Sequence, residues 1–266
     1  MNRLRWIAKY RIVRDHDIRL RDDLRTNLRF VLWDPELESH SYEIDNEDEL
    51  VTFVAELLGA EPRDVERHVE ETRSDPELNE RLARRTRWRF DVKTRPPAGN
   101  RLLWYALARS LKPRLIVETG IYQGLGSLVL LRALERNADE GVEGELLSID
   151  VDPEAGRLVE PGVAARWRKV VGMTTDVLER ELDGRSVQML VQDTPHTYEN
   201  QAFEFGAALA HAGDRLVLVD SGGGRTPALS ELCKRAGGTH RHFRERPHDH
   251  FYPTRGSGVA LIERRS

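Results

Sequence analysis

Short apolar runs alternate with amphipathic stretches through the chain from about residue 101 onward. The runs carry few polar residues, which is typical of strands whose two faces are both covered. The intervening stretches have apolar residues at helical spacing. Six strands are expected, at residues 115–119, 144–150, 168–173, 186–193, 214–220 and 257–263. Because helical stretches separate the first five, the pattern predicts a doubly wound α/β domain around a parallel sheet.

A different pattern covers the first hundred residues, where apolar positions recur at helical spacing only. The stretch 46–59 is the clearest case, since a candidate N-cap asparagine, acidic residues and a final glycine frame it. Two further helices are expected at 61–75 and 76–90, each with a proline near its start. Two prolines and a glycine then interrupt every periodicity over 93–100. We therefore expect a mostly helical N-terminal lobe at 1–98 and a second domain at 99–266.

Composition narrows the class of protein. The 266 residues are 39% hydrophobic and 32% charged, with a net charge of −4, so no nucleic-acid partner is expected. No apolar run approaches the roughly 20 residues that span a bilayer, and the N-terminus lacks the apolar core of a signal peptide. The single cysteine excludes an internal disulfide. A cytoplasmic location is expected, and a homo-oligomer formed through the N-terminal lobe is one option.

The loop VETGIYQGLGS, residues 117–127, follows the first expected strand, where ligands bind in open α/β sheets. It lacks the lysine of a P-loop, and Tyr122 and Leu125 stand where a dinucleotide loop requires glycine. Glu118, just before Gly120, favours a cationic ligand over a pyrophosphate. S-adenosylmethionine (SAM) has a sulfonium, an ammonium and no phosphate. The loop residues expected at this cofactor are Glu118, Gly120, Tyr122, Gly124, Gly126 and Ser127.

A second acid is expected to hold the ribose from the end of the next strand. Asp150 stands there, and Asp152 is the less favoured substitute. An ionised carboxylate accepts hydrogen bonds from both ribose hydroxyls. The alternative for Asp150 is a solvated acid with no ligand. After the third strand, Asp176 is expected near the adenine amine.

Four segments carry a resemblance to a known family, at 101–127, 145–153, 191–205 and 216–221. Their residues resemble class I SAM-dependent methyltransferases, above all the branch of cephalosporin-hydroxylase-like proteins and macrolide-sugar O-methyltransferases. The glycine-rich loop is also similar to that of catechol-type O-methyltransferases. The resemblance covers about residues 40–263. It implies a Rossmann-like sheet of seven strands with the last one antiparallel, in which 239–247 and 256–263 form the final hairpin.

Asp193 and Asp220 end successive expected strands, and neighbouring strands lie about 4.8 Å apart. In the related metal-dependent enzymes, acids at these strand ends bind magnesium, so the resemblance makes Asp193 and Asp220 candidate Mg²⁺ ligands and catalytic residues. Val219 and Ser221 depart from the metal ligands of those relatives. Under the alternative, Asp193 contacts only the cofactor or caps the next helix.

His196 follows Asp193 by three residues, just before an expected helix that Thr197 caps. An imidazole titrates near pH ~6.5 and can remove a hydroxyl proton at neutral pH. The sugar-methylating relatives carry a histidine base at this spacing, while a structural or substrate contact is the alternative. We therefore expect a SAM-dependent methyltransferase that acts on oxygen of a small hydroxylated acceptor. The competing hypothesis is a SAM-binding regulatory or sensing protein without transferase activity.

Overall fold

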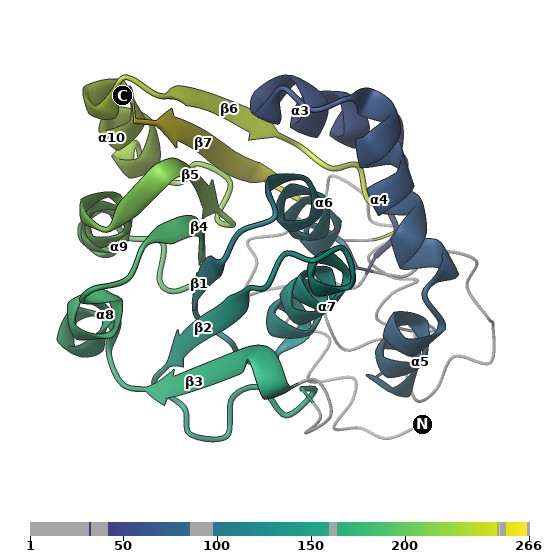
Figure 1. Cartoon of the computed structure of the whole chain (residues 1–266), viewed down its shortest axis with the longest axis horizontal. Coiled ribbons are helices and arrows are strands. Elements are labelled where there is room, and N and C mark those ends of the chain that lie inside the picture. Colours follow the sequence, from purple (N-terminus) through teal and green to yellow (C-terminus); the bar gives the residue numbers. More distant parts are fainter. Residues whose placement is uncertain are drawn as a thin grey trace.

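A seven-stranded sheet crosses the molecule in the order β3-β2-β1-β4-β5-β7-β6 (Figure 1). This computed structural model describes residues 32, 42–85, 98–159, 164–248, 250 and 254–264. The basic N-terminal segment and part of the expected helix at 76–90 lie outside the described residues. The strands are β1 (Leu115–Thr119), β2 (Glu145–Asp150), β3 (Trp167–Val171), β4 (Val187–Gln192), β5 (Ala212–Asp220), β6 (Thr239–Phe243) and β7 (Ser257–Glu263).

Strand directions confirm the expected Rossmann-like fold. The first five strands pair in parallel, while β7 runs antiparallel to both β5 and β6. Each apolar run expected from the sequence forms a strand, with ends displaced by two residues or fewer. The hairpin of β6 and β7 also forms. Because β4 and β5 are neighbours, the ends of these two strands meet at one edge of the sheet.

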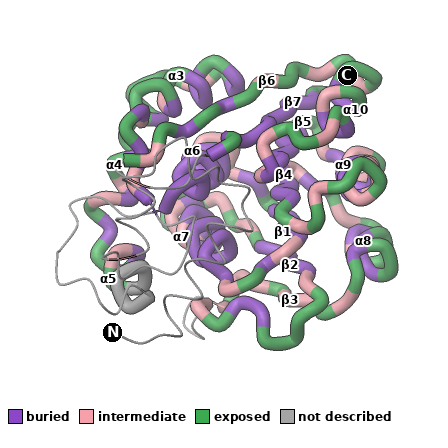
Figure 2. The backbone as a smooth tube through the Cα atoms, turned by 180° about the vertical axis from the view of Figure 1, so that it is seen from behind, coloured by how far each residue is buried: buried purple, intermediate pink, exposed green. Residues whose placement is uncertain are grey.

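Helices cover both faces of this sheet (Figure 1). They are α3 (Glu47–Leu58), α4 (Pro62–Ser74), α5 (Pro76–Arg85), α6 (Arg101–Leu111), α7 (Leu125–Asp139), α8 (Thr174–Leu182), α9 (Tyr198–Ala210) and α10 (Ala228–Ala236), with a short 3₁₀ turn, η1, at Ala164–Arg166. One hydrophobic cluster joins α3, α4, α6 and α7 to the sheet, and a second joins α8, α9 and α10 to its other face. The buried strands and the inward helix faces in Figure 2 mark these two layers.

The N-terminal helices share their core with the sheet domain. Leu50, Phe53 and Val54 of α3 belong to the same buried cluster as Leu128 of α7, and α4 packs against α6. Gly59 ends α3 in the left-handed conformation, as its position after the last apolar residue predicts. The proposed division at residue 98 stays a prediction. Among the described helices, none has the length and hydropathy required to cross a membrane.

A buried ion-pair network fastens α4 to α6 and α7. The Arg109 guanidinium, 1% exposed, lies 2.7 and 2.9 Å from the two carboxylate oxygens of Glu71. It also donates to Asn137 and, at 2.5 Å, to Glu140. Such a paired geometry satisfies a charge that would otherwise be costly to bury. This network orients the N-terminal helices on the layer that carries α6.

Candidate active site

The glycine-rich loop leaves β1 through a close approach between backbones. Gly120 has a φ of 87°, which a side chain disfavours, and a Cβ atom there would collide with the backbone carbonyl of Asp193. Gly126 is also tightly enclosed: its Cβ would lie 2.6 Å from the Trp104 ring and 2.7 Å from a carboxylate oxygen of Glu118. The glycines therefore let the ends of β1 and β4 meet directly beside α6.

Asp150, at the end of β2, stabilises this loop through hydrogen bonds. Its Oδ2 atom accepts hydrogen bonds from the backbone N–H groups of Ile121 at 2.7 Å and Tyr122 at 3.0 Å. Its Oδ1 atom accepts one from Asp152 N at 2.9 Å. Partial burial opposes ionisation, but these N–H donors outweigh it and lower the pKa of Asp150. The carboxylate is therefore ionised at neutral pH, and Oδ1 keeps acceptor capacity.

A pocket of about 350 Å³ opens at the carboxyl ends of the parallel strands. We call it the strand-end pocket; its lining includes Gly120, Asp150, Met173, Asp193 and Asn200. Its position is the one where open α/β sheets bind ligands. The apolar Met173 and the ionised Asp150 give it one surface for a flat ring and one acceptor for hydroxyl groups. The residues that line this pocket and its position at the strand ends suit a nucleoside.

Glu118 lies under the loop, in the protein interior. The carboxylate is 1% exposed and accepts hydrogen bonds from Ser127 Oγ at 2.5 Å and Ser148 Oγ at 2.7 Å. Burial raises the pKa of Glu118 to about 7, although the two hydroxyl donors act in the opposite direction. Neither Glu118 nor Ser127 is among the residues that line the strand-end pocket. Their contact with a cofactor stays a prediction, and the structure gives both a role in supporting the loop.

Three other residues expected at the cofactor occupy the edge of this region. The Tyr122 side chain is 70% exposed, on a backbone with a left-handed φ of 51°. Gly124, with a φ of 92°, precedes the first residue of α7. Asp176 lies exposed in the first turn of α8, where it accepts a hydrogen bond from Thr175. Met173 and Thr174, rather than Asp176, line the strand-end pocket, so an adenine contact by Asp176 also stays a prediction.

A second pocket, of about 210 Å³, adjoins the first. We call it the arginine pocket; its lining includes Arg101, Asp193, His196, Arg225, Glu245 and Arg255. Asp193 lines both pockets and so forms part of the wall between them. The Asp193 side chain is 34% exposed, and its partial desolvation raises the pKa of the carboxyl group, against the opposing effects of Arg101 and of a hydrogen bond from Ser221. Two ligands, one in each pocket, would meet at this carboxylate.

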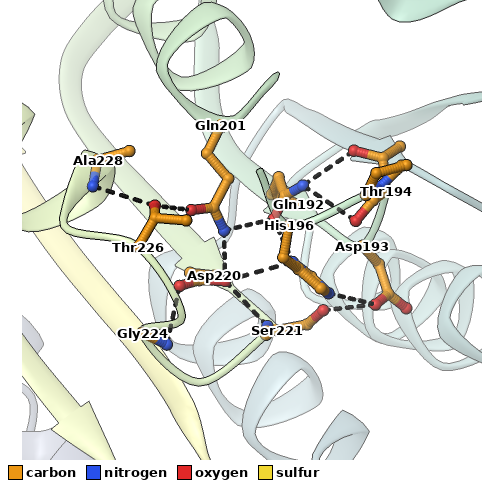
Figure 3. Close-up of polar contacts among 12 residues, drawn as sticks. Gln192, Asp193, Thr194, His196, Gln201, Asp220, Ser221, Gly224, Thr226 and Ala228 are labelled. Atoms are coloured by element: carbon orange, nitrogen blue, oxygen red, sulfur yellow. Dashed lines mark hydrogen bonds and ion pairs between the residues drawn. The ribbon is translucent and has the colours of Figure 1, made fainter. Parts of the chain in front are cut away.

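The imidazole of His196 lies between the carboxylates of Asp193 and Asp220 (Figure 3). Its Nε2 atom is 4.0 Å from Asp193 Oδ1, and its Nδ1 atom is 3.6 Å from Asp220 Oδ1. Thr197 caps α9 by accepting a hydrogen bond from Asn200 N at 3.3 Å, as the sequence predicts. The structure thus brings the three expected catalytic residues into one cluster at the ends of β4 and β5.

The hydrogen bonds of Gln192 determine which ring nitrogen of His196 carries a proton. Gln192 Nε2 lies 3.3 Å from the carbonyl oxygen of Thr194, which can only accept. Gln192 Oε1 is therefore the acceptor that faces His196 Nδ1 at 2.9 Å, and Nδ1 must donate. In the neutral ring, this leaves the Nε2 lone pair directed toward the wall between the pockets. Such a nitrogen can accept a proton from a bound hydroxyl group.

Asp220 is held by protein donors. Its Oδ1 atom accepts hydrogen bonds from Gln201 Nε2 at 2.8 Å and Gly222 N at 2.9 Å, and Oδ2 accepts one from Gly224 N at 3.0 Å. The carboxylate is 1% exposed. In the part of the chain that the structure describes, no three His, Cys, Asp or Glu side chains are grouped to hold a metal ion. Because the His196 ring also stands between Asp193 and Asp220, this pair fits a magnesium site poorly.

Two buried glutamines that contact the cluster escaped the sequence interpretation. Gln192 ends the apolar strand β4, and Gln201 lies on the inward face of α9, both fully buried. Gln201 Nε2 donates to Gln192 Oε1 at 3.0 Å as well as to Asp220. A polar residue inside an apolar run indicates a buried hydrogen bond. It does not indicate the partner, which here comes from another strand or helix.

A family model described as a methyltransferase domain matches residues 117–220, which include the loop, Asp150, His196 and Asp220. Over this stretch the chain is similar to that methyltransferase domain. The recognition of a methyltransferase from the quoted segments is thereby confirmed. No curated protein sequence is similar enough to the chain to match it.

Three solved structures are similar to this chain. One, from Klebsiella pneumoniae and assigned as an O-methyltransferase, is 16% identical over 71% of this chain and 91% of its own, with a TM-score of 0.50. An O-methyltransferase from Bacillus cereus in complex with S-adenosylhomocysteine (SAH) is 15% identical over 81% and 97%, with a TM-score of 0.49. TomG of Streptomyces achromogenes, an O-methyltransferase of tomaymycin synthesis in complex with SAM, is 20% identical over 84% and 100%, with a TM-score of 0.48. At these identities the likeness concerns the fold.

Proposed function

We propose that this methyltransferase uses SAM to methylate a hydroxyl oxygen of a small molecule. The observation that carries the proposal is that Asp193 lines two adjoining pockets, while His196 lines the arginine pocket with its Nε2 atom 4.0 Å from Asp193 Oδ1. A donor in the strand-end pocket and an acceptor in the arginine pocket would present their reacting groups to each other there. Holding two reactants in that geometry supplies much of the rate enhancement of a transfer reaction.

The strand-end pocket fits the adenosyl part of SAM. Asp150 is ionised and offers an oxygen to ribose hydroxyls, while Met173 offers an apolar surface to a base. Gly120 leaves the floor of the pocket without a side chain. When bound, SAM supplies an electrophilic methyl group on a sulfonium.

His196 acts as the general base in this proposal. Its Nε2 atom would accept the hydroxyl proton while the acceptor oxygen takes the methyl group from the sulfonium of SAM, which would leave SAH and an imidazolium ring. Asp220, 3.6 Å from Nδ1, then stabilises the positive charge. Gln192 and Gln201 act as positioning residues, because they hold the ring proton on Nδ1.

Magnesium binding by Asp193 and Asp220 stays a prediction, and no step is assigned to it. Both oxygens of Asp220 already accept hydrogen bonds from the protein. A cytoplasmic location and a homo-oligomer formed through the N-terminal lobe also stay predictions.

Calorimetric titration with SAM, followed by assay of SAH formation on a panel of hydroxylated acceptors, tests the proposal. We expect SAM to bind and at least one acceptor to be methylated, and a comparison of the rates with Mg²⁺ and with EDTA tests the magnesium prediction. Binding of SAM without turnover of any acceptor in either condition would favour a regulatory or sensing protein. NADH binding more tightly than SAM would contradict both.

A further inference from the structure

The arginine pocket is lined by exposed cationic side chains and by buried side chains with acceptor oxygens. Arg225 and Arg255 are its exposed lining residues of positive charge, while Asn100 and Glu245 are buried. Removal of a hydroxyl proton by His196 needs none of these four side chains. Their presence around one cavity therefore indicates the shape and charge of the ligand that binds in the arginine pocket.

Arg225 and Arg255 come from two loops that are fixed against each other. Arg225 follows β5, and Arg255 precedes β7. A Cβ atom on Gly223 would collide with the Cβ of Arg255, so the two loops touch at this point. Among the described residues, no acidic side chain forms an ion pair with either guanidinium. Two such arginines at one pocket favour an anionic group, since a guanidinium binds carboxylate or phosphate through paired N–H donors.

Two buried side chains that line the pocket, Glu245 and Asn100, each have an oxygen atom that is left over as an acceptor. Glu245 is 2% exposed; its Oε1 accepts hydrogen bonds from Tyr42 OH at 2.8 Å and from Thr254 Oγ1, but its Oε2 has no partner among the described residues. Asn100 is 7% exposed, and its Oδ1 likewise has no described partner. Buried acceptors are costly when unpaired. Hydroxyl groups of a ligand would satisfy both.

We propose that the acceptor is a hydroxylated molecule of about one ring that carries an acidic group. Its hydroxyl groups lie toward Asn100, Glu245 and His196, and its carboxylate or phosphate lies toward Arg225 and Arg255. The volume of about 210 Å³ is below the ~300–1,000 Å³ of pockets for drug-sized ligands, which limits the acceptor to a small ring. This inference rests on the proposed function and adds the charge of the substrate to it.

Calorimetry on the SAH-loaded protein tests the inference with matched acids and neutral molecules. The pairs are glucuronate with glucose, glucose 6-phosphate with glucose, and 3,4-dihydroxybenzoate with catechol. We expect the acid of at least one pair to bind about 10-fold or more tightly than its neutral partner, as charge-assisted hydrogen bonds provide. The first two pairs distinguish a carboxylate from a phosphate. Equal affinities of acid and neutral molecule in every pair overturn the inference.

Variants locate the effect. Arg225→Gln and Arg255→Gln should each weaken binding of the preferred acid about 10-fold and leave SAH and the neutral partner unchanged. Arg63→Gln, on an exposed position of α4, is the matched control and should change nothing. Unchanged acid affinity in both pocket variants overturns the inference. The proposed function is judged separately, by SAM binding and by SAH formation on any hydroxylated molecule, so methylation of neutral acceptors alone would retain the function and reject the charge.

Discussion

The ring of His196 packs directly against Gly222: a Cβ atom on that glycine would lie 2.5 Å from His196 Cγ and 2.6 Å from Nδ1. Gly222 also donates its N–H to Asp220 Oδ1 at 2.9 Å. The loop after β5 therefore limits where the imidazole can lie relative to Asp193. The position of the proposed base therefore depends on the absence of a Cβ atom at Gly222.

Gly222→Ala should displace His196 and lower kcat. A shift of about 1 Å in a reacting group costs on the order of 10²-fold in rate, so we expect a loss of about 10- to 100-fold. The SAM dissociation constant should stay unchanged, because Gly222 does not line the strand-end pocket. Gly206→Ala is the control, since a Cβ there meets nothing within 4 Å. Normal kcat in Gly222→Ala would show that the position of the ring is not critical.

His196→Ala should lower kcat by roughly 10²–10⁴-fold, the usual contribution of a general base. Calorimetry should give the same SAM affinity as for the unchanged protein. His211→Ala, at the opposite end of α9, is the matched control and should keep full activity. Wild-type turnover in His196→Ala would remove the general base from the mechanism.

Asp150→Ala should weaken SAM binding by about 1–3 kcal/mol, because charge-assisted hydrogen bonds to the ribose are lost. Asp152→Ala removes a carboxylate two residues away, which is exposed and does not line the strand-end pocket. Its SAM affinity should stay within about 2-fold of the starting value, a difference of under 0.5 kcal/mol. If the two variants behave alike, the ribose contact is assigned to the wrong residue.

Glu118 should make the protein less stable as the pH rises. Its pKa is raised from 4.5 to about 7, so the folded state retains a proton that the unfolded chain has lost. Below the unfolded value both states are protonated and no cost arises. Between pH 4.5 and about 7 the free energy of unfolding falls, by up to roughly 3 kcal/mol from this group.

Glu118→Gln keeps an acceptor for Ser127 and Ser148 and cannot ionise. Urea unfolding at pH 5 and pH 8 should show a smaller loss of stability between these values in the variant than in the starting protein. The same pH dependence in both proteins would contradict the assignment. Circular dichroism at each pH serves as the check that both proteins begin folded.

Arg109→Met should reduce the free energy of unfolding by about 3–5 kcal/mol, because the half-buried Glu71 carboxylate loses its charged partner and keeps the neutral Tyr105 hydroxyl. Arg67→Met on the same helix α4 removes an exposed pair with Asp64 and should cost less than about 1 kcal/mol. Denaturant titration of both variants measures the difference. Similar losses in the two would mean that the buried network does not fasten α4.

Local patterns along the chain were sufficient for most of the fold. The apolar runs from Leu115 to Thr119 and from Ser257 to Glu263 appear as strands with the expected ends, and Gly59 ends α3. Periodicity and termination signals act between residues near in sequence, so one sequence can reveal them. The likeness of the quoted segments to methyltransferases extended this to the antiparallel β7.

The cluster of Asp193, His196 and Asp220 was also accessible, because the ends of neighbouring strands meet at one edge. The contacts that these side chains make depend instead on how distant elements pack together. Three contacts join residues from different strands, helices and loops. Glu118 accepts a hydrogen bond from Ser127, Gln192 contacts His196, and Gly222 packs against the His196 ring. Hydrogen bonds depend on distances and angles within fractions of an ångström. Sequence pattern determines which face a residue occupies, but the packing of distant elements determines which atom it meets.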